Sequence, residues 1–225
     1  MNYAQLVSAI KGYAENDFPT TAGSFTSTDQ VNTFIKESEQ RIYNSVQFPA
    51  IRKNVTGTTT NGNKYLAMPV DFLAPYSMAV IDPATTDYEY LLNKDVNFIR
   101  AAYPSASDSG IPAYYAIFDD NTFILGPTPN AAYTMELHYY YYPASIVDAG
   151  TSWLGDNFDS VLLYGALLEA ASFMKSDPDT IKNYTERYNE ALLLAKRLGD
   201  GLDRSDAYRS GQFRMPNLPQ NSGVR

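Results

Sequence analysis

The stretch Met135–Pro143 reads MELHYYYYP, and it decides how the middle of the chain folds. Successive side chains of a β-strand point to opposite faces, so alternate residues share a face. One set is apolar or aromatic and is expected to face a core: Met135, Leu137, Tyr139 and Tyr141. The other set is expected to face water or a neighbouring subunit: Glu136, His138, Tyr140 and Tyr142. This period of two predicts a strand with one buried face.

His138 is the only histidine of the chain, which makes it the first candidate for a catalytic residue. A general base needs a nucleophile or a carboxylate within hydrogen-bond reach, and none stands at a recognisable motif spacing from His138. We interpret His138 as an ordinary strand residue. Together with Tyr140 and Tyr142 it is a candidate contact between subunits.

The same period of two extends over the region from Pro49 to Pro143, where Gly, Pro, Asn and Asp recur every few residues. Asn61-Gly62 favours a type I′ turn and predicts a hairpin between Val55–Thr59 and Lys64–Met68. Asp119-Asp120-Asn121 predicts a second turn, and the strands it joins are Tyr114–Phe118 and Thr122–Leu125. Further strands are expected near Tyr76–Ile81, Tyr88–Leu92 and Tyr133–Tyr142.

Helical periodicity is found on both sides of this region. Tyr3–Ala14 is predicted to be a helix. Ser27 and Gln30 have the spacing of a capping box, which predicts the start of a second helix that ends near Ser45. Asp156 is a candidate N-cap for a third helix, which spans about residues 157–175. It contains VLLYGALL (161–168), apolar on every side, so it must be covered by a bundle or by another subunit. Asp177-Pro178 begins a fourth helix, expected to end at Leu198-Gly199.

These elements predict an α+β fold. An antiparallel helical bundle (residues 1–48 and 154–202) is interrupted by an antiparallel β-sheet or sandwich (49–153). Residues 203–225 show no amphipathic period and are expected to form an extended C-terminal arm, either a frayed tail or a segment that becomes ordered on a partner. The arm contains spaced basic and apolar residues that could anchor it: Arg204, Tyr208, Arg209, Phe213, Arg214 and Met215.

Composition excludes several classes of function. The 225 residues contain no cysteine, which rules out disulfides and thiol chemistry, and the formal charge of −8 argues against a surface that grips phosphates. Residues 57–64 resemble a phosphate-binding loop, but Tyr65 stands where Ser or Thr would bind magnesium. We expect no cofactor, no metal site and no enzymatic activity. We also expect a soluble protein, because the longest apolar run is far shorter than the roughly 20 residues of a membrane span.

Two longer stretches resemble a known family. The first is Arg52–Gly57 followed by Lys64–Leu73, with a Leu-x-x-Pro-x-Asp-Phe-Leu element that begins at Leu66. The second is Tyr115–Pro129, which continues into Met135–Tyr140 and Pro143. With the flanking helices, these stretches resemble the head-to-tail adaptor proteins of short-tailed bacteriophages, which are related to tail tubular protein A.

The resemblance implies a structural virion protein without catalytic residues. It is synthesised in the cytoplasm of the bacterial host and forms a dodecameric ring under the portal protein, at the head–tail junction. The ring continues the DNA channel without sequence-specific binding and meets the tail nozzle and tail fibre proteins. The arm is a candidate portal anchor. Two other interpretations stay open: a tyrosine-rich carbohydrate-binding module, and a hydrolase built on His138.

Overall fold

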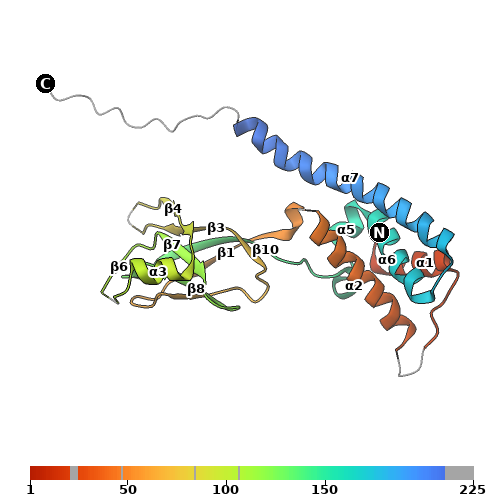
Figure 1. Ribbon diagram of the computed structural model, residues 1–225, viewed down its shortest axis with the longest axis horizontal. Helices are drawn as coiled ribbons and strands as arrows, with labels where there is room; N and C mark the ends of the chain where they lie inside the picture. Colours follow the sequence, from red (N-terminus) through yellow and green to blue (C-terminus); the bar gives the residue numbers. More distant parts are fainter. Residues whose placement is uncertain (21–24, 47, 84, 106, 211–225) are drawn as a thin grey trace. The chain divides into compact units, whose positions relative to one another are not determined.

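The computed structural model describes residues 1–20, 25–46, 48–83, 85–105 and 107–210, and the chain divides into two compact units (Figure 1). The helical unit consists of Met1–Pro49 and Ala144–Arg225, and the β unit consists of Ala50–Pro143. The chain therefore leaves the helical unit once and returns once. The predicted α+β fold with a β insertion is confirmed.

The first two helices lie where the periodicity predicts them. They are α1 (Tyr3–Ala14) and α2 (Ser27–Ser45). The capping box of α2 lies one residue earlier than predicted, because Thr26 is the N-cap and Asp29 completes the box. Gln30 is fully buried instead, and its side-chain amide donates to the carbonyl oxygens of Pro19 and Phe25.

The chain that follows the β unit contains more helices than predicted. They are α4 (Ile146–Ala149), α5 (Trp153–Asn157), α6 (Asp159–Met174) and α7 (Pro178–Ser210). Asp156 lies inside α5 rather than at a cap, and the chain breaks at Phe158 before α6 begins. The predicted end of the last helix at Gly199 is wrong, since α7 continues to Ser210. A glycine in a helix costs only about 1 kcal/mol, which good helix formers on both sides offset.

Helix α6 is the centre of the helical unit. It packs against α1, α2, α5 and α7, which explains why residues 161–168 are apolar on every side. Gly165 is required where α6 passes α2, because a Cβ atom at this position would lie 2.1 Å from the hydroxyl oxygen of Ser38. The bundle of this one chain therefore covers the apolar helix.

The β unit contains two four-stranded sheets. Sheet A has the order β1-β10-β3-β4, and its strands are Arg52–Thr58, Thr134–Tyr140, Ala74–Ile81 and Tyr88–Tyr90. Sheet B has the order β2-β8-β7-β5, and its strands are Tyr65–Ala67, Thr122–Gly126, Tyr114–Ile117 and Leu92–Asn93. The remaining elements of the unit are the 3-10 helix Pro49–Ile51, α3 (Val96–Ala102), β6 (Ser109–Gly110) and β9 (Thr128–Pro129). Among the described residues, the strands pair in an antiparallel manner except β5 with β7 and β6 with β9.

The main core of the β unit lies between the two sheets. Met135, Leu137 and Tyr139 of β10 are buried there, which confirms the predicted inner face of this strand. Helix α3 covers the other side of sheet B, where Ile99 packs against Ala116 and Ile124 (Figure 1). The unit therefore has three layers, with sheet A as an outer layer.

The hairpin predicted at Asn61-Gly62 is wrong in its pairing and in its turn type: a turn exists there, but Gly62 has a positive φ and Asn61 does not, which excludes type I′. The Asn63 N–H donates to the carbonyl oxygen of Thr60 at 3.0 Å, and Gly62 has a φ of 74°. However, β1 pairs with β10 in sheet A, whereas β2 pairs with β8 in sheet B. The turn therefore carries the chain from one sheet to the other. The predicted turn at residues 119–121 does join a hairpin, between β7 and β8.

Candidate subunit interface

The outer face of sheet A gathers side chains from three strands. Arg52 of β1 lies opposite Tyr140 of β10, and His138 lies opposite Ser77 of β3. The register between β10 and β3 shifts after His138, and Tyr76 is the extra residue at this bulge. The bulge therefore brings the Tyr76 ring close to both His138 and Tyr140.

The rings on this face are in direct contact. The Tyr76 ring centroid lies 4.9 Å from that of His138 and 5.8 Å from that of Tyr140. The Arg52 guanidinium lies over both tyrosines, 4.7 Å from the Tyr76 centroid and 5.8 Å from the Tyr140 centroid. Cation–π contacts of this kind hold a long arginine in one orientation. We call Arg52, Tyr76, His138 and Tyr140 the aromatic cluster.

The aromatic cluster is half-buried and still accessible. Tyr76 is 50% exposed, and Tyr90 of the neighbouring edge strand, on the same face, is 68% exposed. Large, rigid aromatic side chains of this kind are enriched in the centres of protein interfaces, because they bury much area and lose little conformational entropy. The face therefore has the chemistry of a contact surface.

The aromatic cluster lacks the parts of a hydrolytic site. Among the described residues, no carboxylate or hydroxyl is hydrogen-bonded to His138, whose neighbour is the Tyr76 ring. Within the residues that the structure describes, no group of three or more His, Cys, Asp or Glu side chains could hold a metal ion. No helix in the described ranges is both long enough and apolar enough to cross a membrane.

On the inner side of sheet A, Asp71 fixes the turn that leads into β3. Its carboxylate accepts a hydrogen bond of 2.7 Å from the Tyr139 hydroxyl and forms an ion pair of 2.7 Å with Lys53. These two partners, Lys53 first, lower the pKa of Asp71 below its usual range. The next residue, Phe72, packs on the rings of Phe123 and Tyr139. The Asp71-Phe72 pair of the sequence motif is therefore structural.

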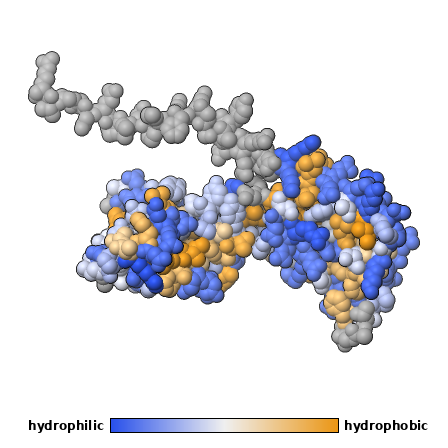
Figure 2. All heavy atoms as spheres, in the orientation of Figure 1, coloured by the Kyte–Doolittle hydropathy of each residue, from blue (hydrophilic) through white to orange (hydrophobic). Residues whose placement is uncertain are grey.

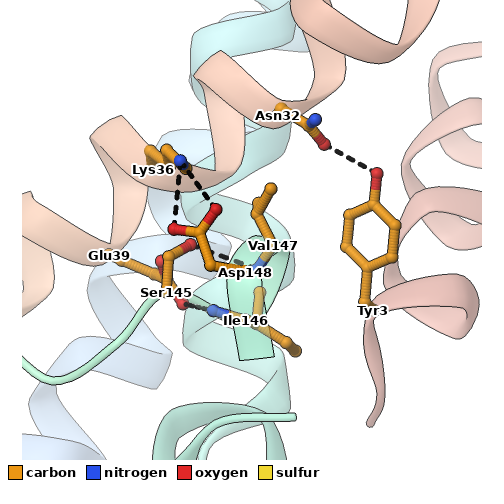
Figure 3. A network of polar contacts seen from close by, with 8 residues as sticks. All are labelled: Tyr3, Asn32, Lys36, Glu39, Ser145, Ile146, Val147 and Asp148. Carbon is orange, nitrogen blue, oxygen red and sulfur yellow. Dashed lines mark hydrogen bonds and ion pairs between the residues drawn. The ribbon is translucent and has the colours of Figure 1, made fainter. Parts of the chain in front are cut away.

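A second polar network holds the point where the chain returns to the helical unit (Figure 3). Glu39 of α2 is 4% exposed, and its carboxylate accepts a 2.9 Å hydrogen bond from the Ile146 N–H at the start of α4. Burial raises the pKa of Glu39, although bonds from Ile146 and Ser145 act in the opposite direction. Lys36 forms an ion pair of 3.1 Å with Asp148 beside it. This network attaches α4 to α2.

Comparison with known proteins identifies the chain's family. The family described as SU10 adaptor protein matches residues 1–216. The chain belongs to the SU10 adaptor protein family. Curated protein sequences give no match. The family places this adaptor among the structural proteins of the phage head–tail junction and is not a known enzyme family.

The structure brings together some of the residues that the sequence predicts to form sites in this adaptor. His138 and Tyr140 share the aromatic cluster, whereas Tyr142 lies beyond the end of β10 and is 39% exposed. Arg52 and Tyr76 were not predicted as site residues, because their positions depend on the strand register and the bulge. Of the predicted arm residues, Arg204, Tyr208 and Arg209 belong to α7. The other three, Phe213, Arg214 and Met215, lie outside the described residues.

Proposed function

We propose that this chain is a tail tubular protein A-like adaptor that forms a dodecameric ring beneath the portal protein. The ring continues the DNA channel and connects the head to the tail nozzle and tail fibre proteins. The observation that carries the proposal is the family match over residues 1–216. The virion assembled around this ring is where the protein acts.

The aromatic cluster supports ring formation. In a closed ring, each subunit uses two different faces, so a surface on one copy must be buried by a different surface of the next copy. The outer face of sheet A is suited to be one of these two faces, since Tyr76 and Tyr90 are exposed there. Apolar and polar residues are interspersed on the face of the β unit drawn in Figure 2, as is usual for such interfaces.

The acidic charge of the chain fits a conduit for DNA. A channel that neutralised many phosphates would hold the genome through the release of counterions, and it would oppose ejection. With 25 acidic residues against 17 basic ones, the subunit has little capacity for such binding. The last turns of α7, with Arg204, Tyr208 and Arg209, are the proposed contacts with the portal protein.

Mass photometry of the purified protein, alone and mixed with the portal ring of the same phage, tests the proposal. We expect a complex that is larger than the portal by the mass of one ring of subunits. The double variant Tyr76→Ser/Tyr140→Ser should reduce ring assembly at least about tenfold, since aromatic anchors contribute 2 kcal/mol or more at an interface. Tyr65→Ser is the matched control, because Tyr65 is 39% exposed on sheet B.

A chain ending at Gly201, which lacks the last turns of α7, should bind the portal more weakly in the same assay. A stable monomer in both samples would contradict the ring and would favour the carbohydrate-binding module, with Tyr140 and Tyr142 as the first residues to test. Unchanged assembly of the double variant would show that the aromatic cluster does not contribute.

A further inference from the structure

The two sheets of the β unit are joined along one side and separate along the other. On the joined side, Leu91 is buried and connects β4 of sheet A directly to β5 of sheet B. On the opposite side, β1 and β2 are the outermost strands of their sheets and do not pair with each other. We call the opening between β1 and β2 the seam.

The seam contains an apolar cavity of about 230 Å³. Its walls come from both sheets and include Val55, Gly57, Leu66, Met68, Met135 and Leu137. Gly57 leaves space there, because a Cβ atom at this position would meet no atom within 4 Å. The cavity can therefore receive apolar side chains at the edge of the core, where burial contributes roughly 25 cal/mol per Å².

The edge of β1 also presents main-chain hydrogen-bonding groups. The Thr59 N–H donates to Tyr133, and the Tyr141 N–H donates to Ile51, so the odd-numbered residues of β1 face β10. The even-numbered residues Asn54, Thr56 and Thr58 therefore direct their N–H and C=O groups away from β10. An edge strand of this kind is a template for one more strand.

The chain itself contains a segment with the matching pattern. Residues 211–216 read GQFRMP, in which Phe213 and Met215 are two residues apart and alternate with Gln212 and Arg214. In a strand, Phe213 and Met215 would enter one face while Gln212 and Arg214 point to water. Pro216 lacks an N–H group and would end the pairing.

The length of α7 and of the chain that follows it allows this segment to reach a neighbouring copy. Ala195 is the last buried residue of α7 among residues 178–197, whose side chains the structure describes, and the helix continues for 15 further residues to Ser210, about 22 Å at 1.5 Å per residue. Figure 1 shows α7 extending beyond α6 within the helical unit. The 15 residues that follow Ser210 can reach roughly 50 Å when extended.

We infer that residues 211–216 of one copy add a strand to β1 of the next copy and place Phe213 and Met215 in the seam. This inference rests on the proposed ring. It reassigns Phe213 and Met215, which the sequence predicts to contact the portal, and leaves Arg204, Tyr208 and Arg209 for that contact.

Cysteine cross-linking tests this assignment cleanly, because the chain has no native cysteine. The double variant Gly57→Cys/Met215→Cys is assembled with the portal under mild oxidation, and the disulfide requires Cβ atoms about 4 Å apart. We expect a ladder of linked subunits on a denaturing gel that collapses on reduction. The control is Gly12→Cys/Met215→Cys, because a Cβ at Gly12 of α1 also meets no atom within 4 Å. It should give monomers.

A second measurement does not depend on the register of the cysteine pair. Rings assembled from a chain that ends at Ser210 should show hydrogen-exchange protection of the Asn54, Thr56 and Thr58 amides that is about tenfold or more lower than in rings of the full chain. Rings that show neither a ladder nor this loss of protection would overturn the seam assignment while the proposed ring stands. A disulfide within one chain would appear on the denaturing gel as a monomer that migrates faster than the reduced chain. This result would show that residues 211–216 come from the same copy and not from a neighbouring one. Failure to find any ring by mass photometry would overturn both proposals.

Discussion

At the scale of single residues, the buried carboxyl group of Glu39 is the least expected feature of the helical unit. A carboxylate that is 4% exposed is tolerated because it accepts the Ile146 N–H, an end group of α4 that has no partner within the helix. The sequence gives no sign of this role, since Glu39 and Ile146 are 107 residues apart. Buried acids of this kind make stability depend on pH.

We predict that Glu39→Gln removes one part of the pH dependence of folding. The pKa of Glu39 is raised in the folded chain, mainly by burial, from an ordinary value of 4.5. The folded state therefore keeps the proton where the unfolded state loses it. The contribution of Glu39 to the free energy of unfolding is full below about pH 4.5 and is lost as pH rises through the folded pKa.

Glutamine keeps an oxygen for the Ile146 N–H but does not titrate, so the variant should lose this decrease in stability with rising pH, whereas the neighbouring ion pair of Lys36 and Asp148 is unchanged in it. The control is Glu39→Ala, which leaves the Ile146 N–H without its acceptor and should cost about 1–3 kcal/mol at every pH. Urea unfolding between pH 4 and 8 measures both. A Glu39→Gln variant with the same pH profile as the parent would contradict the role of burial.

At the scale of elements, local signals predict helices and turns but not which strands pair. The limits of α1 and α2 follow from the apolar period, and the turn at residues 119–121 follows from its Asp and Asn residues. Asn61-Gly62 has equally strong turn chemistry, yet its flanking strands belong to different sheets. Their true partners, β10 and β8, lie far along the chain, and burial between the sheets determines that choice.

The left-handed turn itself gives the next prediction. Gly62 has a φ of 74°, where a Cβ atom is strained, so Gly62→Ala should destabilise the β unit by about 1 kcal/mol. Gly57→Ala is the matched control, because Gly57 has open space and no positive φ. Its effect should be close to zero or slightly stabilising. Thermal unfolding followed by circular dichroism compares the two variants, and equal effects would show that the turn is not under backbone constraint.

At the scale of the whole molecule, the sequence predicts the fold class and only half of the aromatic cluster. His138 and Tyr140 can be placed on one face from the period of β10 alone. Arg52 and Tyr76 join them because β1 pairs along the whole of β10 and because β3 has a bulge beside His138. Neither feature has a local signature, so tertiary packing is what completes the surface.

The division into two units, each with its own core, leads to the last prediction. In calorimetry, the protein should unfold in two transitions rather than one, because each compact unit is large enough to be cooperative by itself. Gly165→Ala places a Cβ 2.1 Å from the Ser38 hydroxyl oxygen and should destabilise the helical unit by about 1–3 kcal/mol, which lowers one midpoint by several degrees. Gly62→Ala should lower the other midpoint. A single transition shifted by both variants would mean that the two units fold as one.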